Sequence, residues 1–186
     1  AFDGLHLGHA GTIGHMLELA RQRGAEATVL TFDPAPREFE DGVRQPGRRL
    51  TTVEEQFCRL REMGVDLTVL FEFPGRIREV EAEDFVRQVL VQQLRVVCVC
   101  ASASHRFGRG GRGDLNLLRQ LGLQYGFEVV TIAPVTLGDQ RISSTLIRNL
   151  LQEGDVTRAA ALLGRPYSIL ADVGEGAGLG AKLGFP

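Results

Sequence analysis

The chain lacks several features that would place it in a specialised class. No apolar run approaches the length that spans a bilayer, and no stretch reads as a secretory signal. Basic and acidic residues nearly balance, 21 against 23, so no overall charge draws the chain toward nucleic acid or a membrane. The three cysteines are odd in number and lack scaffold spacing, which indicates reduced thiols. We therefore expect a cytoplasmic protein whose partners include neither nucleic acid nor a membrane.

What is present suffices for one compact domain. The chain has 186 residues, and 44% of them are hydrophobic, which is ample for a core. Both ends look cut. The chain starts at Ala1, directly on a motif that a strand would normally precede, and it stops at Pro186, soon after a glycine-rich stretch. We expect a fragment whose first strand is missing.

Apolar runs and amphipathic runs alternate along the chain. Strands are expected at 27–32, 66–73, 96–101 and 127–133, and helices at 10–23, 53–63, 82–94, 115–125 and 156–163. Continuous apolar strands separated by amphipathic helices predict a parallel sheet covered on both faces. The predicted fold class is therefore α/β, a Rossmann-like doubly wound sheet whose ligands bind beyond the carboxyl ends of the strands.

The first chemical motif is FDGLHLGH at residues 2–9. His6 and His9 precede an amphipathic run, so they should lie at a helix N-terminus, where free N–H groups and the helix dipole favour an anion. Gly8 would let a large ligand approach the backbone closely. The motif predicts a phosphate seat with two imidazole donors. Two alternatives stay open: polar residues that only cap a helix, and a zinc site, for which no third ligand stands nearby.

A second motif, RISSTLIR at residues 141–148, has adjacent hydroxyls at a predicted helix start. Arg148 follows Ser144 by four residues, which places both on one helix face. A hydroxyl, free N–H groups and a guanidinium form a second possible anion seat. The alternative is an ordinary Ser/Thr N-cap beside a solvated arginine.

Three other patterns are weaker. GEGAGLG at 174–180 lacks the helix that a dinucleotide fingerprint needs, so a flexible loop is favoured there. GRGGRG at 108–113 is one copy of an RNA-binding pattern, and a mobile loop that touches a phosphorylated substrate fits better. Cys98 and Cys100 should share one face of a strand as buried, reduced thiols.

Together these motifs resemble the FAD synthetase (FMN adenylyltransferase) module of the prokaryotic bifunctional riboflavin kinase/FAD synthetase. The resemblance extends to TFDP at 31–34, FG at 107–108, LGRPY at 163–167 and LGFP at 183–186. It implies an adenylyltransferase domain over residues 1–165. It also implies that residues 166–186 are a linker and the truncated start of a riboflavin kinase β-barrel, a domain of the same full-length chain.

The resemblance implies that ATP and FMN, with Mg²⁺, give FAD and pyrophosphate. The catalytic residues it implies are His6, His9, Ser144 and Arg148. The implied nucleotide-binding residues are Phe2, Asp3, Gly4, Gly8, Arg141, Ser143 and Thr145. The implied flavin-binding residues are Phe32, Asp33, Pro34, Ser104, His105, Phe107 and Gly108. No protein ligand to a metal is assigned.

The sequence departs from the family pattern mainly on the flavin side. Ala35 replaces a histidine of the second motif, and Gln56 stands where lysine is common. Ser102, Ser104 and His105 replace a glycine, an amide or acid, and an aromatic residue of the third motif. The resulting hypothesis is that the phosphate machinery persists while flavin affinity or substrate identity has drifted. Two alternative functions are a nucleotidyltransferase for another phosphorylated acceptor, and a binding module without catalysis.

Overall fold

The structure is a computed structural model. It describes residues 2–34, 38–40, 43–44, 49–72, 76–138, 140–171, 174 and 184. Ala35 of the second motif lies outside the described residues, as do nearly all of the glycine-rich stretch and of the expected kinase stub. Residues 166–171 are described and form no helix or strand.

Four strands run as two parallel pairs. The strands are β1 (Thr28–Asp33), β4 (Leu67–Glu72), β5 (Cys98–Ser102) and β6 (Glu128–Ile132). β1 pairs with β4 and β5 pairs with β6, and each pair is joined through a crossover helix. The four predicted strands are therefore confirmed, as is their parallel arrangement. Within the described residues they form two two-stranded sheets rather than one continuous sheet.

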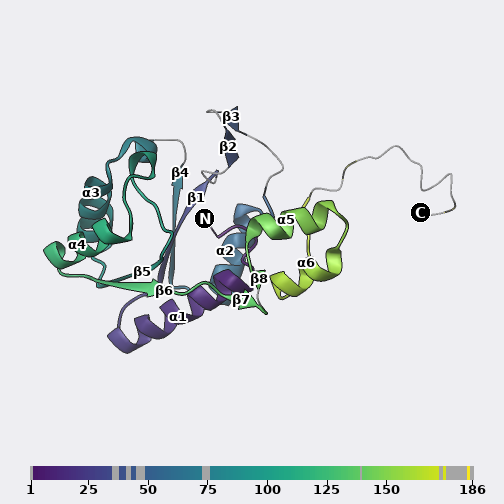
Figure 1. The fold of residues 1–186 in the computed structure, drawn as a ribbon, viewed down its shortest axis with the longest axis horizontal. Coiled ribbons are helices and arrows are strands. Elements are labelled where there is room, and N and C mark those ends of the chain that lie inside the picture. The colour runs from purple at the N-terminus through teal and green to yellow at the C-terminus, as the bar shows by residue number, and fades with distance from the viewer. Residues whose placement is uncertain are drawn as a thin grey trace.

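Helices cover both faces of β1. α1 (Leu7–Arg23) and α2 (Val53–Glu62) pack with Val29 in one apolar cluster. Leu30, the next residue along the strand, packs instead against the cluster formed by α3 (Ala82–Phe85), η3 (Val86–Gln93) and α4 (Leu115–Tyr125). Successive strand residues point to opposite faces, so this split is what a doubly wound α/β fold requires. Figure 1 shows α3 and α4 on one side of the strands and α2 on the other.

A third cluster forms around two short helices, α5 (Ser144–Gln152) and α6 (Val156–Leu163). It includes Leu50, from the segment that leads into α2, and Ile142, which precedes α5. In Figure 1 this pair of helices lies on the side of the molecule opposite α3 and α4. The cluster positions the start of α5 close to the start of the chain.

Several local features differ from the predictions. α1 begins at Leu7 instead of residue 10, because His6 caps it. The helix expected at 82–94 is present, but η3 is wound as a π-helix, with the Leu94 N–H donating to the Val89 carbonyl. Six short elements were not predicted, since periodicity is not visible in two to four residues. They are the β2–β3 hairpin (Phe39–Glu40 and Val43–Arg44), the β7–β8 hairpin (Thr136–Leu137 and Gln140–Arg141), η2 (Arg76–Glu79) and η4 (Arg109–Gly111). Among the described residues no helix is long and apolar enough to cross a membrane.

The packing of α2 gives a direct stability prediction. Leu60 is fully buried, whereas Leu123 on α4 is 88% exposed. We expect Leu60→Ala to lower the free energy of unfolding by about 2–5 kcal/mol, because it removes buried methyl groups and leaves a cavity. Leu123→Ala is the matched control and should change it by less than about 0.5 kcal/mol. Urea denaturation measures both, and equal effects would contradict this core assignment.

Candidate functional site

The first motif folds as a tight, strained turn that ends at a helix cap. Gly4 and Leu5 both have positive φ, 80° and 38°. Glycine tolerates that region, but a leucine there is strained, typically by about 1–3 kcal/mol. Position 4 also has no room for a side chain, since a Cβ would lie 2.7 Å from the Leu50 Cδ1 atom. The Gly4 N–H donates to the Thr51 hydroxyl at 3.1 Å, which fixes the turn against the entrance to α2.

His6 is the N-cap of α1, and this contact settles its tautomer. Its Nδ1 accepts a hydrogen bond from the His9 N–H at 3.2 Å, so the proton of the neutral ring is assigned to Nε2. Burial and, to a smaller extent, the nearby Arg165 guanidinium lower the pKa of His6 to about 4. His6 is therefore a neutral N–H donor at neutral pH. Gly8 is needed here because a Cβ would lie 3.0 Å from the His6 ring.

The two histidine rings lie in contact. The His6 and His9 rings stack with centroids 3.7 Å apart, and the Phe2 ring meets His9 edge-on at 5.2 Å. Both rings thus lie beside the first turn of α1, as the sequence predicts. The described residues contain no group of three or more His, Cys, Asp and Glu side chains that could hold a metal.

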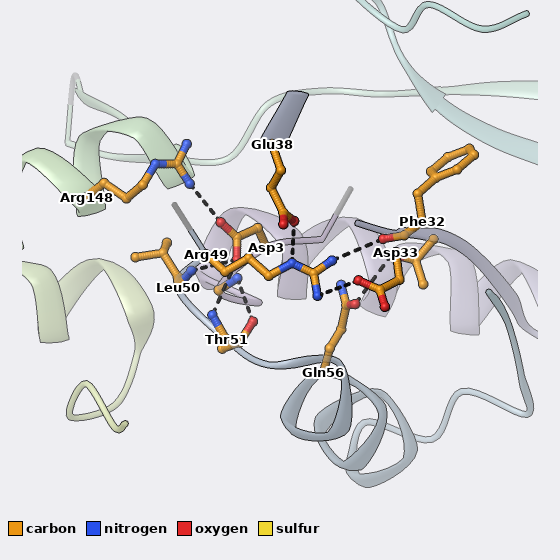
Figure 2. Close-up of polar contacts among 11 residues, drawn as sticks. Asp3, Phe32, Asp33, Glu38, Arg49, Leu50, Thr51, Gln56 and Arg148 are labelled. Carbon is orange, nitrogen blue, oxygen red and sulfur yellow. Dashed lines mark hydrogen bonds and ion pairs between the residues drawn. The ribbon is translucent and has the colours of Figure 1, made fainter. Parts of the chain in front are cut away.

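Asp3 joins the first and fourth motifs. Its carboxylate accepts hydrogen bonds from the Leu50 N–H at 2.9 Å and the Thr51 N–H at 3.4 Å, and it forms an ion pair with Arg148 at 2.7 Å. The Ser144 hydroxyl donates to the Asp3 carbonyl at 2.9 Å. Figure 2 shows Asp3 between Arg148 and the backbone of residues 50–51.

Burial is the dominant influence on the Asp3 carboxyl group. It raises the pKa of Asp3, while the two backbone donors and Arg148 act in the opposite direction. The carboxylate is thus engaged inside the protein, and a direct contact between Asp3 and a nucleotide stays a prediction. The structure does bring the two predicted anion seats together, since both are fixed to this one residue.

The start of α5 has the N-cap that its motif allowed, and Arg148 is paired with Asp3 instead of being solvated, while binding of an anion there stays a prediction. Ser143 is the N-cap, with its hydroxyl accepting from the Leu146 N–H at 3.2 Å. Thr145 accepts a weaker contact from Arg148 at 3.4 Å. Arg141 lies in the exposed β7–β8 hairpin, two residues before the cap.

The predicted flavin residues lie along a row of aromatic rings. Phe32, at the end of β1, contacts Phe71, and the row continues through Phe85 and Phe107 to His105, with centroids 5.6 to 6.3 Å apart. The His105 and Phe107 rings are stacked, 16° from parallel. The row joins the second and third motifs, which are far apart in sequence. Phe71 and Phe85 were not predicted as site residues, because an apolar position in a strand or helix carries no separate signal.

The third-motif loop differs from the row in its exposure and packing. Ser104 and His105 are exposed in the turn that follows β5. Gly108 packs against α3, where a Cβ would lie 2.5 Å from the Ala82 Cα atom.

Arg49 is a further site residue that the sequence did not indicate. It donates to the Phe32 carbonyl at 3.2 Å, and it forms ion pairs with Asp33 at 3.1 Å and with Glu38 (Figure 2). Pro34 follows directly after a cis peptide bond. Arg49 immediately precedes residues 50–51, whose backbone N–H groups donate to Asp3. Residues 49–51 therefore contact both the second motif and the first.

The strand cysteines lie apart from these groups. Cys98 and Cys100 are free and half-buried in β5. Burial raises the pKa of both thiols, that of Cys100 to about 12. They are therefore protonated at neutral pH, and they belong to no group of three or more possible metal ligands among the described residues.

An α/β fold in which two helix N-termini converge beside the ends of parallel strands is typical of nucleotide-binding proteins. Residues 1–146 match the family model described as FAD synthetase. The chain belongs to the FAD synthetase family.

Similar proteins agree with this assignment. The chain is 36% identical over 185 residues to the bifunctional riboflavin kinase/FMN adenylyltransferase of Escherichia coli (strain K12), and 34% identical over 185 residues to the protein of the same name from Listeria monocytogenes. Each match covers all of this chain but only 59% and 58% of the relative. A crystal structure titled macrolide-efflux protein, from Streptococcus pneumoniae, is similar with a TM-score of 0.83 and 25% identity, over all of this chain and 60% of that one.

The buried cap histidine gives a pH prediction. His6 has a pKa of about 4 in the folded protein and about 6.5 when unfolded, so the unfolded chain binds more protons between these values. Stability from this group is complete above about pH 6.5 and is lost as the pH falls toward 4, amounting to about 3 kcal/mol.

The comparison variant is His6→Asn, whose side-chain oxygen still caps the helix but does not titrate there. Urea denaturation at several pH values between 4 and 7 should show a shallower pH dependence for the variant. Parallel curves for the two proteins would show that His6 titrates normally.

Proposed function

We propose that this chain is an FMN adenylyltransferase, which forms FAD and pyrophosphate from ATP and FMN. The observation that carries the proposal is the convergence of two helix N-termini, those of α1 and α5, on Asp3 through Ser144 and Arg148. Family membership and the names of the relatives support the same reaction.

In this proposal an oxygen of the FMN phosphate attacks the α-phosphorus of ATP in line. The bond from that phosphorus to the oxygen bridging to the β-phosphate breaks, and pyrophosphate leaves with the electron pair. Such a reaction needs little covalent work from the protein, and it depends on positioning and on donors where negative charge gathers. We assign those donors to the N–H groups that open α1 and to His6 and His9, with His9 nearer the reacting α-phosphate.

The neutral state of His6 suits this role. Because Nδ1 is occupied by the His9 N–H, Nε2–H is the group that remains to donate to a phosphate oxygen. On the opposite side we assign the β- and γ-phosphates to Ser144 and Arg148. Arg148 contacts Asp3 and Thr145, and its guanidinium carries five N–H donors in a planar fork that suits phosphate oxygens.

We propose that Mg²⁺ enters with ATP, as part of the substrate. Mg²⁺ usually keeps several waters and is held by substrate phosphates with one or two carboxylates. A protein cage of three or more ligands is not required for that mode, and the described residues offer none. The ion would neutralise charge on the leaving pyrophosphate.

The acceptor side is proposed to be the aromatic row from Phe32 to His105. A flat ring system can stack on such a surface, and His105 and Phe107 already stack on each other. The departures at Ser102, Ser104 and His105 fall here. We therefore infer that FMN binds more weakly than in a relative with the usual motif. Isothermal titration would test this inference. Equally tight binding would count against a change in flavin affinity.

We further propose that the adenylyltransferase domain ends near residue 165. Support comes from α6, whose Leu162 and Leu163 pack into the same cluster as Leu50 and α5. The matched relatives are bifunctional and the chain spans about three fifths of their length, so we propose that a riboflavin kinase domain belongs to the same full-length protein. The three free cysteines support a reducing, cytoplasmic setting.

The proposed activity is tested by incubating the protein with ATP, Mg²⁺ and FMN. We expect FAD and pyrophosphate to form in equal amounts. Chromatography measures the FAD, and a coupled assay measures the pyrophosphate. If turnover occurs only with a different phosphorylated acceptor, that acceptor and not FMN is the substrate. Binding of ATP or FMN without turnover would make the chain a nucleotide-binding module.

The histidine roles are tested by His9→Ala. We expect kcat to fall by about 100-fold or more, because one donor to the reacting phosphate is lost. His15→Ala is the matched control, since His15 lies on an exposed face of the same helix and should leave kcat unchanged. Near-normal FAD formation by His9→Ala would refute the assigned role.

A further inference from the structure

We propose that Arg165 is a positioning residue for the phosphate seat: it holds the strained turn at Gly4 and Leu5 so that His6 and the start of α1 face the nucleotide. The proposal rests on the proposed function for its catalytic readout, but not for its structural one. Arg165 lies outside the first and fourth motifs, beyond the end of α6.

The contacts of Arg165 go to the backbone of the first motif. One terminal nitrogen donates to the Gly4 carbonyl at 2.8 Å. The other donates to the carbonyls of Leu5 at 3.4 Å and Leu163 at 3.3 Å. A single guanidinium thus bridges the turn and the end of α6, across 160 positions of sequence in the case of Leu5.

The turn at Gly4 and Leu5, which Arg165 contacts, is strained and therefore depends on contacts that hold it in place. Leu5 has a φ of 38°, in the region that favours glycine, and its side chain is buried. A strained residue persists only where the surroundings fix it from more than one side. The Thr51 hydroxyl accepts from the amide of the turn, and Arg165 donates to its carbonyls. His6 is the next residue, so a shift in the turn moves the cap of α1.

Packing supports the same connection. Gly164, the C-cap of α6, has a φ of 73°, and a Cβ there would lie 2.6 Å from the Leu7 Cδ2 atom. Leu7 is the first residue of α1. Farther along, the Ser168 hydroxyl lies 2.8 Å from the Glu55 carboxylate on α2. The segment 164–168 is therefore fixed against both helices that flank the seat.

The charge of Arg165 contributes as well. A guanidinium beside His6 favours the neutral imidazole, the form in which Nδ1 can accept from the His9 N–H. Lysine cannot reproduce this arrangement. Its N–H donors are all on one nitrogen atom, whereas two different nitrogen atoms of Arg165 donate to the bound carbonyls.

The test uses Arg165→Lys and Arg165→Met, with Arg158→Lys as the matched control. Arg158 lies on α6 and is exposed, with Asp155 as its partner. The first readout needs no substrate: the imidazole ¹⁵N and ¹H signals of His6 during a pH titration. We expect both Arg165 variants to weaken the single-tautomer signature of His6, and Arg165→Met, which removes the positive charge, also to move the His6 midpoint upward from about 4, while the control matches the wild type.

The second readout is steady-state kinetics. We expect Arg165→Lys to lower kcat/KM for ATP by about 10- to 100-fold, as for a small misplacement of catalytic groups. The KM for FMN should stay nearly unchanged. In the His6→Asn background the same change should have a much smaller effect, because the two residues act through one another.

The outcomes separate cleanly. An unchanged His6 tautomer signature in Arg165→Lys, or losses that are additive with His6→Asn, would overturn the proposal and leave Arg165 a stabilising residue only. If Arg165→Met does not fold, Arg165→Lys decides. A wild-type protein that makes no FAD would refute the proposed function, while the His6 titration would still test the placement of the ring.

Discussion

The constraint on which this site depends is the buried carboxylate of Asp3. Removal of a charge from water costs several kcal/mol unless partners compensate for it. The partners here are the N–H groups of Leu50 and Thr51 and the guanidinium of Arg148, which are 47, 48 and 145 positions away in sequence. Because each must be in place for the carboxylate to stay buried, the first motif, the entrance to α2 and the start of α5 have one allowed arrangement.

That arrangement also decides the charge that a phosphate would meet. A carboxylate without partners would repel a phosphate bound beside it. The charge of Asp3 is instead compensated by Arg148 and by two backbone donors. His6 adds an N–H without adding a charge, because burial keeps its ring neutral. Because the Asp3–Arg148 pair carries no net charge, the attraction for an anion comes mainly from the helix N-termini, and this attraction does not vary with pH in the physiological range.

The sequence predicted the elements and the ends of helices better than the contacts between distant segments. Apolar periodicity located α4 to the residue, and α2 begins at residue 53 as expected, since the Thr52 hydroxyl caps it by accepting from the Glu55 N–H. Caps are local, so they leave a pattern in neighbouring residues. Arg49 leaves none, because its partners are the Phe32 carbonyl and the carboxylates of Asp33 and Glu38, which the fold brings to it. Arg165 stands in the LGRPY pattern, but that pattern does not indicate its contacts with the first motif.

The two halves of the site differ in how far they can change. Ser104 and His105 are exposed, and substitutions at exposed positions usually alter stability by less than about 0.5 kcal/mol. Asp3 and His6 are buried and hydrogen-bonded to the backbone, so replacing either leaves unsatisfied partners. A chain under ordinary stability limits can therefore vary the loop at Ser104 and His105 more readily than the turn at Asp3 and His6. The departures at residues 102, 104 and 105 are exposed, as this division expects, whereas the departure at Gln56 is buried on α2.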